Sequence, residues 1–270
     1  MAPLPPAEIA TYRAWLRDRW SVEIEGDPLE HAAYDPRIPL PDPATALGIA
    51  EERDPARGLT SDQATFFVAE SLRREGEHLR GRTVWEVGCG TGVLSALAGK
   101  LGARRVLATD VDPAAVALAR RTGERNGVAI EAAVASLFDG SPWTEAVDVL
   151  IADLPQKPVG GGSLPLGQDG GPDGSRWLLP FLEGARLRMK PGGRLYFFCH
   201  SLTHPQALQA LHRLYRPRLL STMWRIFERD CYSGVFSYLE KRRGEGLSRF
   251  WDLPDGRFAF LAMNFAATPR

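Results

Sequence analysis

The fold is best predicted from the stretch Val84-Trp85-Glu86-Val87-Gly88-Cys89-Gly90-Thr91-Gly92. A short apolar segment, Thr83–Val87, precedes three glycines, and a helical pattern over Val93–Leu101 follows them. Glycines between a strand and a helix allow a sharp turn and let a ligand lie close to the backbone. The stretch therefore predicts a strand, a ligand-binding glycine turn and a helix of an α/β fold.

The spacing of the glycines indicates which ligand the turn accepts. A dinucleotide site has the pattern G-x-G-x-x-G, with the pyrophosphate at the helix N-terminus. Here the pattern is G-x-G-x-G, and Glu86 stands two residues before the first glycine. A carboxylate at that point would repel a pyrophosphate and favour a cation such as an amino group or a sulfonium. NAD is therefore not expected to bind.

A second acidic residue follows at the end of the next predicted strand. Asp110 comes directly after Arg105–Thr109 in the sequence Ala108-Thr109-Asp110-Val111-Asp112. A carboxylate there can accept hydrogen bonds from both hydroxyls of a ribose. Together with the glycine turn, it predicts a nucleoside site.

Strands and helices alternate over the rest of the chain. The predicted strands are Thr83–Val87, Arg105–Thr109, Ile130–Ala135, Val147–Ala152, Arg194–Cys199, Leu219–Phe227 and Phe258–Asn264. The predicted helices are Ala7–Trp20, a helix from an N-cap at Ser61 or Asp62 to about Glu75, Val93–Leu101, Pro113–Asn126, Trp177–Met189 and Gln206–Tyr215. The alternation predicts an α/β fold with a doubly wound, Rossmann-like, mostly parallel seven-stranded sheet.

Two segments depart from this alternation. Residues 1–58 are rich in proline and charge, and the stretch Tyr34–Pro43 is too rich in proline for regular structure. We expect residues 1–58 to form an N-terminal helical or irregular cap or lid over the acceptor pocket, and residues 59–270 to form the ligand-binding domain. The glycine-rich segment Gly160–Gly174 is expected to be either a flexible active-site loop or disordered.

With these motifs in place, the sequence resembles the class I S-adenosylmethionine-dependent methyltransferases over roughly residues 59–200. It is most similar to the branch that contains glutamine-amide and small-subunit RNA methyltransferases. Further residues carry this resemblance: Thr60–Phe67, the segment after Asp110, Ala135–Phe138 and Gly170–Gly174. The resemblance implies S-adenosyl-L-methionine as cofactor and S-adenosyl-L-homocysteine as product. The cofactor-binding residues that it implies are Glu86, Gly88, Gly90, Gly92, Asp110, Val111, Ser136, Leu137 and Asp153.

The chain departs from that branch at two positions. Ser136 stands where the branch usually has an aspartate next to the adenine. The fourth motif usually reads Asn/Asp-Pro-Pro-Tyr/Phe, and here it reads Asp153-Leu154-Pro155-Gln156, referred to below as the DLPQ segment.

The DLPQ segment follows the apolar strand Val147–Ala152, so it lies at a carboxyl end of the sheet, where open α/β folds bind ligands. We predict three catalytic residues here. Asp153 orients the acceptor and receives its proton or partners its developing positive charge, Pro155 fixes the geometry, and Gln156 replaces aromatic stacking with a hydrogen bond. The alternative is that Asp153 only caps a turn.

Because Gln156 has no aromatic face, the sequence favours methyl transfer to a nitrogen or sulfur of a small polar molecule, such as an amine, an amino acid or a thioether. One alternative is a protein glutamine-amide methyltransferase. Another, of a different class, is a regulatory subunit that binds the cofactor without catalysis. His200 and His204 are four residues apart, but no third ligand is evident, so no metal is expected. His200 is a candidate for contact with the acceptor.

The composition restricts partners and location. Lys plus Arg and Asp plus Glu balance at 33 each, so nucleic acid is not an expected partner. No apolar run approaches the roughly 18 residues of a membrane span, and the N-terminus does not resemble a secretory signal. Three isolated cysteines are typical of reduced thiols. We therefore expect a cytoplasmic protein; a homodimer is compatible with the sequence.

Overall fold

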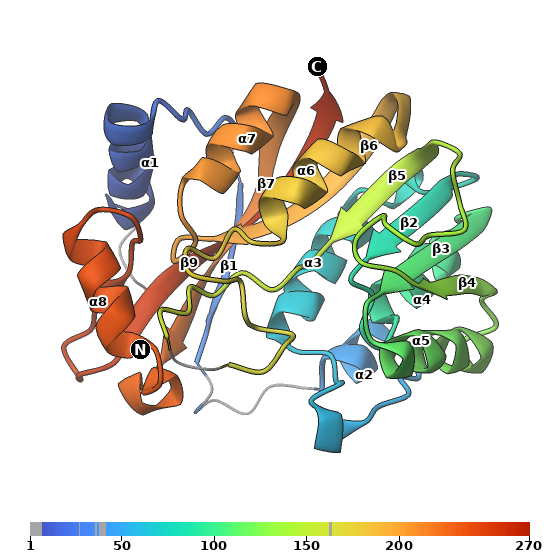
Figure 1. The fold of residues 1–270 in the computed structure, drawn as a ribbon, viewed down its shortest axis with the longest axis horizontal. Coiled ribbons are helices and arrows are strands. Elements are labelled where there is room, and N and C mark those ends of the chain that lie inside the picture. The colour runs from blue at the N-terminus through green and yellow to red at the C-terminus, as the bar shows by residue number, and fades with distance from the viewer. Residues whose placement is uncertain (1–6, 27, 36, 38–41, 162–163) are drawn as a thin grey trace.

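The computed structural model describes residues 7–26, 28–35, 37, 42–161 and 164–270, and Figure 1 shows their fold. The helices are α1 (Ala7–Trp20), α2 (Pro43–Leu47), α3 (Gln63–Arg74), α4 (Val93–Lys100), α5 (Pro113–Arg125), α6 (Leu178–Leu187), α7 (Gln206–Leu214) and α8 (Phe236–Gly244). The strands are β1 (Leu29–Tyr34), β2 (Thr83–Val87), β3 (Arg105–Asp110), β4 (Ile130–Val134), β5 (Val147–Ala152), β6 (Met189–His200), β7 (Tyr215–Phe227), β8 (Trp251–Asp252) and β9 (Phe258–Pro269). Short 3-10 helices are η1 (Pro55–Arg57), η2 (Gly76–His78) and η3 (Arg229–Tyr232).

The strands form one sheet in the order β1-β7-β9-β6-β5-β2-β3-β4, with β8 paired to β9. Strand β9 is antiparallel to β6, β7 and β8, and the other neighbouring strands are parallel. The predicted Rossmann-like, mostly parallel sheet is thereby confirmed. The pattern predicts seven strands, and the sheet has nine within the described residues, because β1 and the two-residue β8 add to it.

The order of the strands determines where a ligand can bind. From β2 the chain moves outward through β3 to β4, and it then returns to the other side of β2 to form β5. The carboxyl ends of β2 and β5 therefore flank the point at which the winding reverses. In doubly wound sheets the ligand crevice lies at this point. Gly88 follows β2 and Asp153 follows β5, so both predicted motifs lie there.

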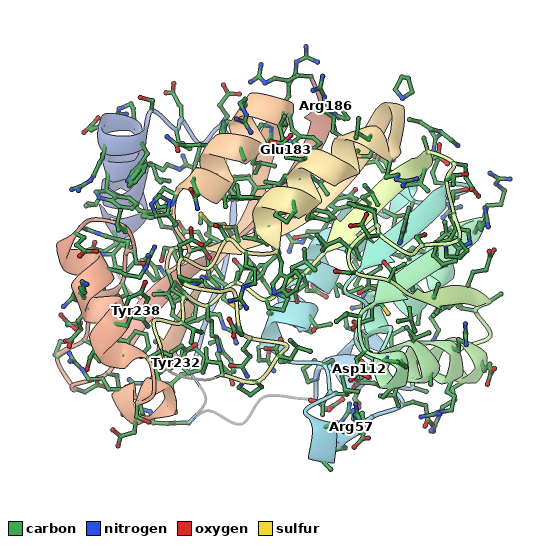
Figure 2. All side chains as sticks on the ribbon, viewed as in Figure 1. Arg57, Asp112, Glu183, Arg186, Tyr232 and Tyr238 are labelled. Atoms are coloured by element: carbon green, nitrogen blue, oxygen red, sulfur yellow. The ribbon has the colours of Figure 1, made fainter. Side chains whose placement is uncertain are left out.

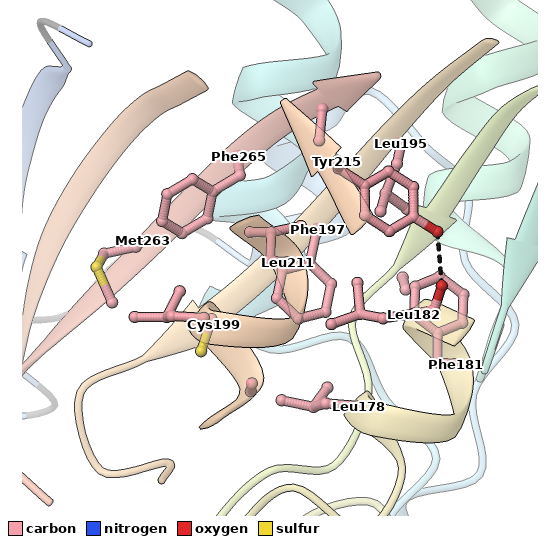
Figure 3. Packing of buried hydrophobic residues seen from close by; sticks show 14 of the residues in the cluster. Leu178, Phe181, Leu182, Leu195, Phe197, Cys199, Leu211, Tyr215, Met263 and Phe265 are labelled. Carbon is pink, nitrogen blue, oxygen red and sulfur yellow. Dashed lines mark hydrogen bonds between the residues drawn. The ribbon is translucent and has the colours of Figure 1, made fainter. Parts of the chain in front are cut away.

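Helices cover both faces of the sheet. Alternation along β2 directs Trp85 and Val87 into a core shared with α1, α6 and α7, whereas Val84 faces a core shared with α2 to α5. Figure 1 shows α6 and α7 lying over one face, and Figure 3 shows the packing beneath them. There, the hydroxyl of the fully buried Tyr215 donates to the carbonyl oxygen of Leu182 at 2.6 Å, which ties the start of β7 to α6.

Local signals in the sequence explain where two helices begin. The Oδ1 atom of Asp62 accepts from the backbone N–H groups of Ala64 at 2.7 Å and Thr65 at 3.1 Å, so Asp62 is the N-cap of α3. This settles the choice between Ser61 and Asp62. Helix α5 begins at Pro113, where a missing N–H costs nothing.

The N-terminal region is not uniform. Helix α1 matches the predicted helix, and its Tyr12 and Leu16 are buried in the core under α6 and α7. Strand β1 is an edge strand of the sheet, paired with β7, so this part of the expected cap belongs to the main fold. Residues 36 and 38–41 of the proline-rich stretch lie outside the described residues.

The glycine-rich segment lies against the chain that follows β5. The N–H of Lys157 donates to the carbonyl oxygen of Gln168 at 3.1 Å, and the N–H of Gly170 donates to the carbonyl oxygen of Lys157 at 2.9 Å. Residues 162–163 lie outside the described residues. In its described part, the segment is a loop attached to the DLPQ region rather than a disordered stretch.

Candidate active site

The glycine turn after β2 is shaped by what its glycines face. A Cβ atom on Gly88 would lie 2.6 Å from Cδ2 of Leu154, and one on Gly92 would lie 2.7 Å from Cα of Ala119 in α5. Gly88 and Gly92 therefore allow the DLPQ segment and α5 to pack closely. A Cβ on Gly90 would have no atom within 4 Å. The turn is thus packed on two sides and open at Gly90, where a ligand can approach the backbone.

Asp110 at the end of β3 connects to this opening. Its Oδ2 atom accepts from the N–H of Gly90 at 2.9 Å, and its Oδ1 atom accepts from the N–H of Asp112 at 3.0 Å. Burial raises the pKa of Asp110. Each carboxylate oxygen has a second lone pair, so the group can still accept from two hydroxyls beside the turn.

Three further residues predicted to bind the cofactor lie at the same edge of the sheet. Val111 is 50% exposed although it is apolar, and it directly follows Asp110. Ser136 is exposed, and Leu137 has a φ of +56°, with its carbonyl oxygen accepting from the hydroxyl of Thr109 at 3.2 Å. The structure thus brings these predicted residues together at the ends of β3 and β4. Their contact with the cofactor stays a prediction.

Glu86 lies behind the turn. Its Oε2 atom accepts from the N–H of Ser95 at 2.8 Å and from the Ser95 hydroxyl, so the carboxylate holds the first turn of α4. The pKa of Glu86 is raised to about 8, mainly by burial and in part by the nearby carboxylates of Asp153 and Asp110. Ser95 was not among the predicted residues, although its place in the first turn of α4 is a signal for such a contact.

These residues fit the cofactor that the resemblance implies. Glu86, Asp110 and Asp153 come together from three strand ends, and none of them has an ion pair with a Lys or Arg in the part of the chain that the structure describes. A nearby positive charge favours the ionised form of such acids, so acids without a basic partner suit a cationic ligand. S-adenosylmethionine carries a sulfonium and an ammonium group, and its ribose offers hydroxyl donors to Asp110.

Asp153 directly follows β5 at the carboxyl edge of the sheet. Its side chain makes no hydrogen bond or ion pair with any residue that the structure describes. Its pKa is raised from 3.8 to about 7, mainly by burial and in part by the Asp62 carboxylate, while the Arg225 guanidinium opposes the shift. The next residue, Leu154, is buried against Gly88, which joins the DLPQ segment to the glycine turn. Pro155 is half-buried between them and Gln156.

The amide of Gln156 points into the fold, away from the position that we predicted for it. Its Nε2 atom donates to the carbonyl oxygens of Leu154 and Phe198, both at 3.3 Å, and its Oε1 atom accepts from the N–H of His200 at 2.9 Å. The residue is 3% exposed. Because its donors and acceptor are all occupied, a hydrogen bond from Gln156 to the acceptor does not fit this geometry. The amide instead ties the DLPQ segment to the end of β6.

The two histidines have separate surroundings. His200 is buried, its Nδ1 atom lies 3.2 Å from the hydroxyl of Thr203, and burial holds its pKa well below the usual value. His204 is half-buried, and its Nδ1 atom accepts from the N–H of Gln206 at 3.1 Å. Within the described residues, no group of three His, Cys, Asp or Glu side chains is arranged to hold a metal ion.

The segment before α3 contacts the glycine turn, a role that the sequence did not predict. The Oε1 atom of Glu51 accepts from the hydroxyl of Thr91 at 2.6 Å and from the N–H of Ser61 at 2.7 Å. Arg57 forms an ion pair of 3.1 Å with Asp112 at the start of α5, and Figure 2 labels both residues. Residues 51–57 therefore lie against the glycine turn and the start of α5, and the expected cover over the acceptor pocket stays a prediction.

Comparison with known proteins agrees with this geometry. The family described as "Ribosomal protein L11 methyltransferase (PrmA)" matches residues 64–159, which include β2, the glycine turn, Asp110 and the DLPQ segment. The ribosomal protein L11 methyltransferase of Photobacterium profundum is 31% identical over 155 residues, which are 57% of this chain and 45% of the relative. That of Aeromonas hydrophila is 41% identical over 122 residues, which are 45% of this chain and 40% of the relative. The chain thus spans less than half the length of the curated relatives it matches.

Solved structures of methyltransferases are also similar. A ribosomal protein L11 methylase from Lactobacillus delbrueckii subsp. bulgaricus matches with a TM-score of 0.47 and 20% identity, over 75% of this chain and 79% of that one. A T. Thermophilus 16S rRNA methyltransferase (RsmC), in complex with AdoMet and Guanosine, matches with a TM-score of 0.49 and 16% identity, over 79% of this chain and 44% of that one.

These comparisons correct one prediction and leave others open. The predicted small polar acceptor, and with it the small-molecule partner, is wrong, because the matched family and the relatives are named for action on ribosomal protein L11, which is a protein. No helix of the described residues is both long and apolar enough to cross a membrane. The cytoplasmic location, the homodimer and the absence of nucleic acid stay predictions. Over the matched residues the chain is similar to methyltransferases, and its sheet has the Rossmann-like order that the class I resemblance implies.

Proposed function

We propose that this chain transfers the methyl group of S-adenosylmethionine to a nitrogen atom of a protein, with ribosomal protein L11 as the first substrate to test. The similarity to L11 methyltransferases over the glycine turn, Asp110 and the DLPQ segment supports a protein substrate. Because the match covers less than half of each of these relatives, the substrate's identity is part of the proposal.

The observation that carries the proposal is the state of Asp153. This carboxylate lies beside the cofactor turn, is largely buried and has no partner among the described residues. The bound cofactor supplies an electrophilic methyl group on a sulfonium. The nitrogen that receives it must present a lone pair, and an amine must first lose a proton. With a pKa of about 7, Asp153 can hold an N–H of the acceptor and take up that proton near neutral pH.

The rest of the DLPQ segment serves to fix Asp153. Leu154 packs on Gly88, and the Gln156 amide joins the segment to Phe198 and His200 at the end of β6. Correct placement of a nucleophile against its reaction partner can lower a barrier by roughly 7–11 kcal/mol. Gln156 is therefore a positioning residue in this proposal, and Pro155 limits the conformations of the segment.

Two kinds of protein nitrogen fit this site, and pH distinguishes them. An amino group is protonated near neutral pH, so its methylation should accelerate as the pH rises above 7. A glutamine amide, the acceptor type of the branch that the sequence resembles, is already neutral. Its methylation should depend on pH only through Asp153 itself, and should level off above a pH of about 7.

The test is to incubate the purified protein with S-adenosylmethionine carrying an isotope-labelled methyl group and with unmethylated ribosomal protein L11, alone and within ribosomes. We expect label in the protein fraction, and mass spectrometry of its peptides to place the methyl group on nitrogen. If S-adenosylmethionine binds but neither L11 nor any other ribosomal protein gains label, the proposed substrate class is wrong.

A further inference from the structure

A buried arginine lies at the carboxyl edge of the sheet, beyond Asp153. Arg225 near the end of β7 is only 7% exposed. Its guanidinium carbon lies 5.4 Å from the ring centre of Tyr34, 5.4 Å from that of Phe227 and 5.9 Å from that of Phe260. The three aromatic rings hold the guanidinium in one place through cation–π contacts.

The positive charge of Arg225 has only a distant ion-pair partner among the described residues. Its Nε atom is buried and has no hydrogen-bond partner among the described residues. The one ion pair it makes within the described residues joins its NH2 nitrogen to Oδ2 of Asp62 at 3.8 Å, which is longer than a hydrogen bond. Asp62 is 60% exposed on its side chain, and its other oxygen already caps α3. A buried guanidinium that lacks hydrogen bonds costs free energy unless a ligand supplies them.

Arg225 lies on the acceptor side of the site. Alternation along β7 puts it on the same face as Met223, in the core that α3 covers, and alternation along β6 puts His200 on that face with Phe198. Arg225, His200 and Asp153 lie at or next to the carboxyl ends of β7, β6 and β5, which share one edge of the sheet, and the charge of Arg225 lowers the pKa of both other groups. Strands β9, β6 and β5 separate β7 from the glycine turn after β2.

We propose that Arg225 binds a carboxylate of the substrate protein. This carboxylate lies close to the acceptor nitrogen, whose N–H group Asp153 holds. A carboxylate can accept two parallel hydrogen bonds from a guanidinium, and its negative charge would balance the charge of Arg225. Asp153 and Arg225 then hold two groups of the same substrate segment, a nitrogen and an acid. The inference rests on the proposed function, since it presumes a protein substrate. The carboxylate comes either from an Asp or Glu side chain or from a chain terminus.

Binding of peptides separates this inference from the methyl transfer. Three fluorescent peptides are titrated with the protein in the presence of S-adenosylhomocysteine at roughly 0.15 M salt. The first has a central lysine flanked by two glutamates on each side and an amidated end. The second has glutamines instead of glutamates. The third has glutamines and ends directly after the lysine with a free carboxylate. We expect the first or third peptide to bind about tenfold more tightly than the second, which corresponds to about 1.4 kcal/mol.

The variants assign this preference to Arg225. The preference is the ratio of the affinities for the carboxylate peptide and the glutamine peptide. Arg225→Met should reduce this ratio to about one. Arg225→Lys keeps the charge but loses the paired donors of the guanidinium, and it should reduce the ratio at least about threefold. Arg243 provides the matched control, because it lies 4.1 Å from the ring centre of Phe250 but is balanced by Asp252 at 2.8 Å. Arg243→Met should leave the preference unchanged.

Several outcomes would overturn the inference. These are equal binding of all three peptides, no binding of any of them, or a preference that survives in Arg225→Lys. If Arg225→Met does not fold, as judged by thermal unfolding, Arg225→Lys alone decides. A preference that depends on Arg225 in a protein that methylates no ribosomal protein would support the inference while contradicting the proposed function.

Discussion

Replacing Asp153 with asparagine should stabilise the cofactor-free protein, and the gain should grow as the pH rises from about 4 to about 8. Burial raises the pKa of this carboxyl from 3.8 to about 7 in the folded protein. The unfolded chain ionises it near pH 4. Between these two values the folded protein holds a proton that the unfolded chain has released. The stability contributed by Asp153 therefore falls as the pH rises through this window.

The size of the effect follows from the two pKa values. The difference between 3.8 and about 7 is about three pKa units. Each unit corresponds to about 1.4 kcal/mol, so the upper limit is about 4 kcal/mol at pH 8. Asp153 keeps some accessible surface, so the measured gain should be smaller. Asparagine has nearly the same shape and does not titrate, so the difference from the wild type should be small near pH 4.

The free energy of unfolding of both proteins is measured by urea unfolding, with tryptophan fluorescence as the signal. The measurement is repeated at several pH values between about 4.5 and 8. Asp112→Asn is the matched control, because the Ala114 N–H and Arg57 lower the pKa of Asp112. At pH values above its pKa, the ionised Asp112 side chain therefore stabilises the folded protein. That variant should gain no stability in the same window. A stability gain for Asp153→Asn that does not change with pH, or a loss of stability at pH 8, would refute the reasoning.

Three further predictions concern the cofactor and the DLPQ segment. Asp110→Ala should weaken binding of S-adenosylmethionine by roughly 1.5–3 kcal/mol, because it removes the acceptor for two ribose hydroxyls; unchanged affinity in calorimetry would remove that assignment. Glu51→Ala should weaken the same binding several-fold by freeing Thr91 in the glycine turn, whereas Glu52→Ala, at the surface, should not; equal effects would contradict the role of Glu51. Gln156→Ala should lower the midpoint of thermal unfolding and the turnover rate but preserve cofactor affinity, because it releases the DLPQ segment from β6; an unchanged turnover rate would rule out a positioning role.

The features that the sequence predicts well depend on local signals. Apolar runs of five or six residues correspond to β2, β3 and β5, and the glycine turn separates the first of them from α4. The N-cap at Asp62 and the start of α5 at Pro113 depend on residues within one helical turn. Because parallel strands end at one edge of a sheet, the approach of Asp110 and Asp153 follows from these elements alone.

The features that the sequence does not predict depend on distant contacts. Strand β1 has a mixed sequence, Leu-Glu-His-Ala-Ala-Tyr, and it forms by pairing with β7 near the other end of the chain. Gln156 follows the strand as predicted, but the direction of its amide is set by Phe198 and His200 on β6. Arg225 is one basic residue in a predicted strand, and only the register with β1 and β9 surrounds it with aromatic rings.

The most direct test of the central claim is the rate of a single turnover of methyl transfer to ribosomal protein L11, with saturating S-adenosylmethionine, in the wild type and in Asp153→Asn. Asp153 should hold the acceptor nitrogen and take its proton, and loss of such a positioned group typically lowers the rate about 100-fold or more. We expect that decrease with the fold and most of the cofactor affinity preserved. Label transfer to L11 at equal rates in the two proteins would contradict the role of Asp153, and absence of transfer from the wild type would contradict the assignment of a protein substrate.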